Sequence, residues 1–132
     1  MSGKGPDLAG ATVVNQTQGT TLAVDVQHAR TRWQRLVGLM GRAGLAEGTA
    51  MLFTPIRGVH THFMRFPIDL VFVAVEGEGT GHVTKVRERM VPFRIDLAGG
   101  DLLIELPAGT IARTATAVSD RVSIVRRADR AG

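Results

Sequence analysis

Short apolar runs separated by turn residues make up most of the chain, and this pattern predicts strands joined by tight connections. Gln18 and Gly19 separate the first two runs, which we expect to form a β-hairpin. In the second run Leu22, Val24 and Val26 alternate with other residues, as on one face of a half-buried strand. The expected strand segments are 11–17, 20–29, 50–54, 59–64, 68–75, 82–90, 102–106 and 122–126.

The segment 68–75 is apolar at every position except Asp69, which is the pattern of a central strand covered on both faces. A carboxylate at the start of such a strand must be hydrogen-bonded or paired with a cation. The alternating glycines of 76–81 predict a flexible turn after this strand. No helix pattern follows them, so a phosphate-binding loop is not supported.

One segment departs from the strand pattern. Its apolar positions 33, 36, 37 and 40 have helical spacing, which predicts a short amphipathic helix over 31–40. Thr31 is a suitable N-cap and Gly41 a suitable stop, and Trp33 is expected to anchor the helix in the core. Together the segments predict a mainly β domain, a sandwich or barrel-like sheet of about eight short strands with this one helix.

The length of 132 residues fits one domain, which we place at 11–127 between polar tails at 1–10 and 128–132. Hydrophobic residues make up 44% and charged residues 21%, which favours a globular over a disordered protein. The absence of cysteine excludes disulfides, thiolate metal sites and cysteine nucleophiles. No apolar run is long enough for a transmembrane helix, and the first residues contain no signal peptide, so we expect a cytoplasmic protein.

The net charge of +4 and the pI near 11.0 reflect cations that are nearly all arginine. Arginines gather at 30, 32, 35 and 42 and again at 126, 127 and 130, where they could contact phosphates. A solvated face and a terminal tail explain them better. Aromatic residues make up only 5%, so the stacking platforms of single-strand binders are missing, and we expect no nucleic-acid partner.

His60, His62 and Met64 would project from the same face of a strand, with neighbours about 6–7 Å apart. Two imidazoles and a thioether could hold a soft metal ion such as copper, with a further ligand from Asp69, Glu105 or His82. Half-exposed strand histidines and a core methionine are the favoured alternative, because no second ligand motif is present. We therefore predict no cofactor and keep the metal site as an alternative.

Arg65 and Asp69 lie on either side of Pro67, which interrupts a regular strand ladder. One interpretation is that Asp69 accepts backbone N–H bonds at this bend, or pairs with Arg65, and fixes the corner. In the other interpretation Arg65 presents its guanidinium to an anionic ligand while Asp69 orients it. Glu105 ends a strand before the turn of 107–109, where it could cap the turn or pair with an arginine.

Four blocks of residues occur in a family-specific order. They are Gly38-Leu39-Met40-x-Arg42, Met51-Leu52-Phe53, His60-Thr61-x-Phe63-Met64-Arg65-Phe66-Pro67-Ile68-Asp69-Leu70-x-Phe72 and Glu105-Leu106-Pro107-Ala108-Gly109. In this order, over roughly Leu22 to Val125, the chain resembles domain-of-unknown-function family 192. The resemblance implies a small mainly β domain with one helix, and no established activity, substrate or cofactor.

Many members of that family carry Trp-Met-Lys-Asn-Thr where this chain has Phe63-Met64-Arg65-Phe66. The chain resembles a branch that keeps the cation and lacks the amide and hydroxyl. His62 is not part of the family pattern, which weakens the two-histidine metal site. Other members often carry an export signal, which this sequence does not show.

These observations lead to a first hypothesis of a small anionic ligand bound in a polar pocket lined by His60, Arg65, Asp69 and Glu105. Arg65 would hold the anionic group, and His60 would act as donor or general base. The hypothesis leaves open whether the protein is an enzyme. The alternatives are a non-catalytic module for protein–protein interaction or assembly, and metal binding at His60, His62 and Met64.

Overall fold

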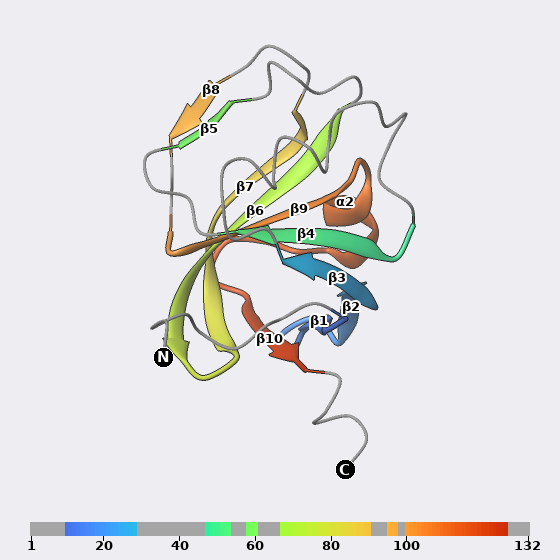
Figure 1. Ribbon diagram of the computed structural model, residues 1–132, viewed down its shortest axis with the longest axis vertical. Helices are drawn as coiled ribbons and strands as arrows, with labels where there is room; N and C mark the ends of the chain where they lie inside the picture. The colour runs from blue at the N-terminus through green and yellow to red at the C-terminus, as the bar shows by residue number, and fades with distance from the viewer. Residues whose placement is uncertain are drawn as a thin grey trace.

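The computed structural model describes residues 10–28, 47–53, 58–60, 67–90, 95–97 and 100–126. These residues form an eight-stranded sheet in the order β2-β1-β10-β7-β6-β9-β4-β3, a separate two-stranded sheet of β5 and β8, and one short helix (Figure 1). The strands are β1 (Thr12–Asn15), β2 (Thr20–Ala23), β3 (Asp25–His28), β4 (Thr49–Phe53), β5 (Gly58–His60), β6 (Ile68–Gly77), β7 (Thr80–Met90), β8 (Ile95–Leu97), β9 (Leu102–Pro107) and β10 (Arg121–Val125), and the helix is α2 (Thr110–Thr114).

A bend at Val24 curls the large sheet into a nearly closed barrel. The chain pairs with β1 before the bend and with β4 after it, so β2 and β3 occupy the two ends of the sheet order. The N–H groups of Val24 and Asp25 both donate to the Gly48 carbonyl at the bend, at 2.8 and 3.1 Å. The Gly10 N–H donates to the Val26 carbonyl at 2.7 Å and draws the start of β1 toward β3.

This bend corrects one detail of the prediction. The sequence predicts that Leu22, Val24 and Val26 share one buried face of a single strand. Leu22 and Val26 are buried, but Val24 is 57% exposed, because the chain changes partners there. The predicted hairpin of the first two runs is confirmed by the antiparallel pairing of β1 with β2.

The β6–β7 hairpin is the longest pairing of the sheet, and its register shifts at three places, which bend and twist the pair. Strand pairing continues to Gly77 and Thr80, so only Glu78 and Gly79 form the turn. The turn predicted over 76–81 is therefore present but shorter than expected, because 76–77 and 80–81 belong to the strands. A side chain at Gly81 would place its Cβ 2.4 Å from the Ala74 carbonyl oxygen, so this glycine serves the close approach of the strands.

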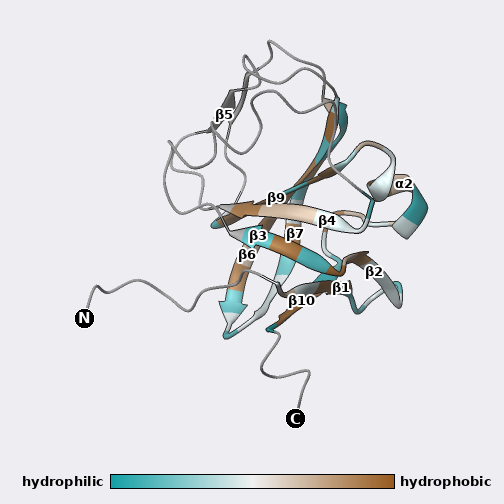
Figure 2. Cartoon of the chain, turned by 45° about the vertical axis from the view of Figure 1, so that its right-hand side comes forward, coloured by the Kyte–Doolittle hydropathy of each residue, from teal (hydrophilic) through white to brown (hydrophobic). Residues whose placement is uncertain are grey.

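Both faces of β6 are covered from Ile68 to Val73, as the sequence predicts for a central strand, whereas Val75 is 50% exposed. Its register with β9 has no shift, so directly opposed residues share a face. Val71 and Val73 belong to the main core inside the barrel, together with residues of β1, β4, β9 and β10. Leu70 and Phe72 project from the opposite face and are also fully buried. β6 turns from hydrophobic to hydrophilic toward its end at the hairpin (Figure 2).

The mainly β, barrel-like fold is confirmed, and the remaining differences concern individual elements. The predicted helix over 31–40, both tails apart from residue 10, and the segment 61–64 lie outside the described residues. The helix α2 and the strand β8 are additions that the pattern of the sequence does not predict. No helix within the described ranges is long and apolar enough to cross a membrane.

Candidate functional site

Asp69 is fully buried on the core face of β6, and its carboxylate accepts three backbone hydrogen bonds. Oδ1 accepts from the Arg89 N–H at 2.8 Å, and Oδ2 accepts from the N–H groups of Gly109 at 3.1 Å and Ile111 at 2.8 Å. The interpretation that Asp69 accepts backbone N–H bonds is confirmed, but these donors belong to β7 and to the segment after β9 and not to the bend at Pro67.

The three N–H donors lie where the regular hydrogen bonding of the backbone is interrupted. Arg89 has a φ of +51° beside a register shift in β7, so its N–H does not belong to a regular ladder. Gly109 precedes α2 with a φ of +96° and supplies no side-chain cap. Ile111 lies in the first turn of α2, where backbone N–H groups lack helical partners. Asp69 thus stabilises a bulge and a helix start with one carboxylate.

Glu105 lies on the opposite face of the sheet from Asp69. In the β6–β9 register Asp69 is opposite Leu106, and Leu70 is opposite Glu105, so the two carboxylates point to different sides. Glu105 is 1% exposed, and its strand neighbours on the same face are Leu70 and Met51, both buried. Glu105 takes part in a further interaction, so it is not left alone in this apolar setting.

The other predicted site residues are only partly placed. His60 ends β5, where it is opposite Ile95 of β8 in a ribbon beyond one end of the barrel (Figure 1). Arg65, His62 and Met64 lie outside the described residues. The pocket of His60, Arg65, Asp69 and Glu105 stays a prediction as a whole, and within it the register separates Asp69 from Glu105. Among the described side chains, no group of three or more His, Asp or Glu could hold a metal ion.

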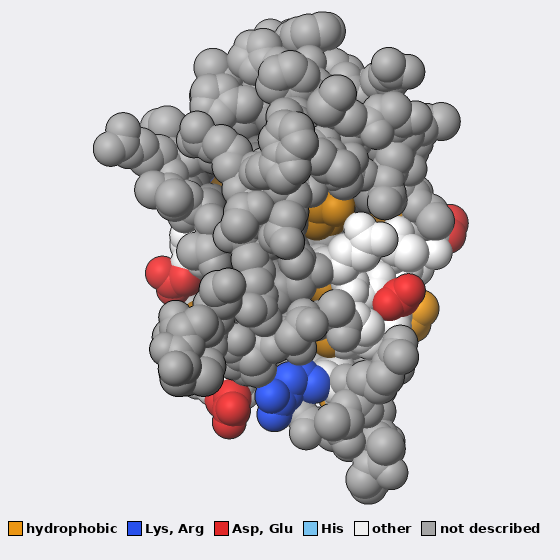
Figure 3. Space-filling view, in the orientation of Figure 1, with side chains coloured by type: hydrophobic (Ala, Val, Ile, Leu, Met, Phe, Trp, Pro, Cys, Tyr) orange, Lys and Arg blue, Asp and Glu red, His pale blue; other side chains and the backbone are white. Residues whose placement is uncertain are grey.

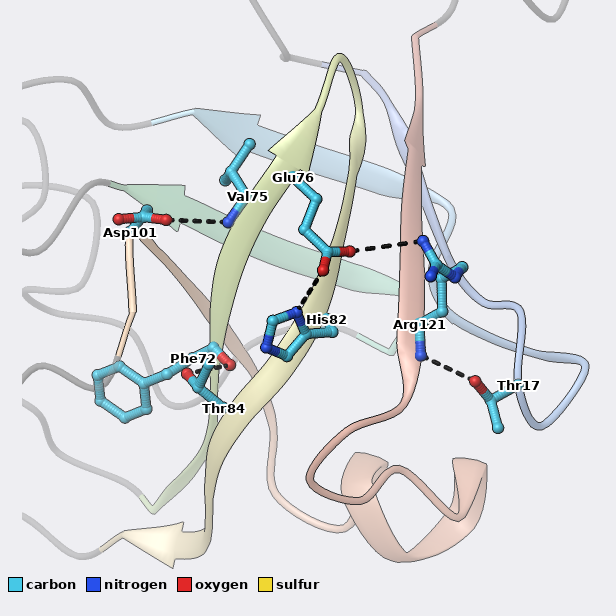
Figure 4. A network of polar contacts seen from close by, with 8 residues as sticks. All are labelled: Thr17, Phe72, Val75, Glu76, His82, Thr84, Asp101 and Arg121. Atoms are coloured by element: carbon cyan, nitrogen blue, oxygen red, sulfur yellow. Dashed lines mark hydrogen bonds and ion pairs between the residues drawn. The ribbon is translucent and has the colours of Figure 1, made fainter.

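His82, considered above as a further metal ligand, belongs to an exposed polar network across β6, β7 and β10 (Figure 4). Its Nδ1 lies 2.9 Å from Oε2 of Glu76, whose Oε1 lies 3.4 Å from Nη1 of Arg121. The Arg121 N–H donates to Thr17 Oγ1 at 2.8 Å. The three charged or titratable side chains are between 40% and 58% exposed, which is typical of weak surface pairs. On the face seen in Figure 3, the described acidic side chains lie apart from one another.

A buried polar network near the β1–β2 turn was missed by the sequence analysis. Asn15 is fully buried, and its Nδ2 donates to Asp120 Oδ2 at 2.9 Å and to Thr116 Oγ1 at 3.2 Å. Burial raises the pKa of Asp120, but hydrogen bonds from Asn15, the Ala117 N–H and Gln18 outweigh it and lower the pKa below its ordinary value. The signal was available, since Asn15 follows Val13 on the buried face of β1.

Residues 13–124 match the DUF192 family, which is described as an uncharacterized ACR. The chain belongs to this family. Its two blocks that contain Asp69 and Gly109 meet through the hydrogen bond between these residues. Comparison of the DUF192 chain with curated proteins found no match.

Two solved structures are similar to this DUF192 chain. One is a protein from Sinorhizobium meliloti 1021 that is provisionally described as a transcription regulator. It has a TM-score of 0.70 and 25% identity, with 86% of this chain and 91% of that chain covered. The other is a protein of unknown function from Novosphingobium aromaticivorans DSM 12444. It has a TM-score of 0.70 and 24% identity, with 86% and 83% covered.

Proposed function

We propose that this protein binds a small anionic ligand at a polar site on the Glu105 face of the sheet, with Arg65 and His60 as its other members. The observation that supports this site is the burial of Glu105, which is 1% exposed on a face it shares with Met51, Leu70 and Phe72. Burial of a carboxylate among apolar side chains destabilises the folded state by several kcal/mol unless a cation or hydrogen-bond donors compensate the lost hydration.

Arg65 is the cation that we assign to Glu105. It belongs to the same family block as Leu70, the residue directly opposite Glu105. A guanidinium can donate to a carboxylate with two N–H groups and keep further donors for a ligand. Glu105 would then orient the arginine, and the arginine would bind the carboxylate or phosphate of the ligand. His60 would complete the site as a hydrogen-bond donor.

Asp69 has a different role in this proposal from the one the sequence suggested. Its two oxygens are engaged by three backbone N–H groups on the core face. In this proposal Asp69 therefore stabilises the site from the opposite face of the sheet and does not contact the ligand. The provisional description of the Sinorhizobium relative as a transcription regulator agrees with a sensing role for such a ligand.

Thermal unfolding of the dialysed protein with inorganic phosphate and with succinate tests the proposal. A ligand that binds only the folded state raises the Tm, by several degrees when its concentration is well above the Kd. We expect Arg65→Ala and Glu105→Gln to abolish this rise. Arg113→Ala, which removes an exposed arginine that lies 3.4 Å from Glu47, should preserve it. An equal response of Arg65→Ala and the wild type to both anions would refute the proposed site.

A further inference from the structure

We propose that Asp69 is a positioning residue for Glu105, because it fixes the turn after β9 and with it the register that places Glu105 on its face of the sheet. The inference rests on the proposed function for the use of this site. It deepens that proposal by naming the residue on the opposite face that determines the site's geometry.

Strand register decides on which face Glu105 lies. β9 is paired on both sides, with Glu105 opposite Leu70 of β6 and opposite Met51 of β4. Side chains alternate between the faces of a strand, so a slip of one residue would move Glu105 into the main core and Ile104 out of it. Apolar residues flank Glu105 on both sides along β9. They favour the observed register but do not determine it alone.

The hydrogen bonds of Asp69 are compatible with the observed register alone. Asp69 lies opposite Leu106, and its Oδ2 reaches the N–H groups of Gly109 and Ile111, which follow β9 directly. A slip of one residue would displace these donors by about 3.3 Å, which is too far for a hydrogen bond. The third bond, to the Arg89 N–H, anchors the same carboxylate to β7 at 2.8 Å. Asp69 therefore couples β6, β7 and the end of β9.

The environment of the Glu105 carboxylate can be followed without any ligand by ¹³C NMR of glutamate-labelled protein, with the resonance assigned through Glu105→Gln. We expect Asp69→Asn to shift this resonance and to speed amide exchange of residues 103–106 at least tenfold relative to wild type. Asp69→Glu, which keeps the charge but adds a methylene group, should also shift the resonance and covers the case in which Asp69→Asn does not fold.

Asp120→Asn is the matched control, because it also weakens a buried carboxylate network, the one around Asn15. A loss of stability without positioning would give the same Glu105 resonance in the Asp69 variants as in wild type, and that result would overturn the inference. An equal shift in Asp120→Asn would also overturn it. A shifted resonance in a protein that ignores phosphate and succinate would retain the positioning role and reject the proposed function.

Discussion

The Oδ2 atom of Asp69 accepts a hydrogen bond from the Gly109 N–H at 3.1 Å, across a separation of 40 residues. Asp69 is the second residue of β6, a central strand of the barrel, and Gly109 precedes the only helix in the described part of the chain. The bond joins two of the residue blocks that carry the resemblance to the family. At least this pair of blocks is therefore linked by the architecture of the fold itself.

Replacement of Asp69 by alanine should destabilise the protein strongly. It leaves three backbone N–H groups without their acceptor, at Arg89, Gly109 and Ile111. Hydrogen bonds to a charged acceptor are each worth about 1.5–3 kcal/mol, so we expect a loss of about 3 kcal/mol or more in the free energy of unfolding measured with urea. The exposed Asp25→Ala should change it by less than about 0.5 kcal/mol. Similar losses in both variants would contradict this assignment.

Two glycines of similar appearance in the sequence should respond differently to alanine. In Gly81→Ala the new Cβ would lie 2.4 Å from the Ala74 carbonyl oxygen and 2.7 Å from Val73 Cγ1, so the β6–β7 pairing must shift. A Cβ added at Gly19 would meet no atom within 4 Å beyond the neighbouring residues. Only the left-handed backbone conformation of Gly19, with a φ of +70°, therefore disfavours alanine there. We expect a loss of about 1–2 kcal/mol for Gly19→Ala and a clearly larger one for Gly81→Ala in the same urea series. The reverse order would show that the strands do not approach so closely.

The sequence predicted those features that depend on local pattern. The apolar run of β6 identified a covered central strand, and its one carboxylate, Asp69, was correctly expected to be hydrogen-bonded. The partners of Asp69 could not be foreseen, because the strand and turn that supply them are far away along the chain. In the same way, alternation of residue types revealed the second run but not its bend at Val24, which depends on Gly48.

The candidate site was harder to predict than the fold. Asp69 and Glu105 were grouped because both are acidic residues in the family blocks. Whether they share a face depends on the pairing of β6 with β9. A register shift of one residue would move Glu105 to the face of Asp69. The helix α2 was missed because five residues are too few for helical periodicity to be visible, and because Asp69, far from it in sequence, supplies the hydrogen bond to its first turn.

The exposed network of Glu76, His82 and Arg121 should contribute little to stability. Its ion pairs are partly solvated, so side-chain entropy and screening offset most of their attraction. A double-mutant cycle of Glu76→Gln and Arg121→Ala should give a coupling below about 1 kcal/mol that decreases at high salt. A larger coupling that does not respond to salt would indicate that this network closes the contact between β7 and β10.

Stability should fall in acid partly because of Asp120. Its pKa in the folded protein lies below the ordinary value of 3.8, since hydrogen bonds from Asn15, Ala117 and Gln18 outweigh the opposing effect of burial. The unfolded chain therefore binds the proton more tightly than the folded one. The stabilisation is fully present above the ordinary pKa and is lost as the pH falls through it toward the lower folded value.

Asp120→Asn should consequently lower the stability at neutral pH and show a smaller decline than wild type between about pH 5 and pH 2. Urea unfolding across this range measures the difference between the two curves. Glu78→Gln removes a carboxylate from the exposed β6–β7 turn and controls for the change in net charge. If Asp120→Asn and wild type differed by the same amount at every pH, the carboxylate would contribute through its shape and not through its ionisation.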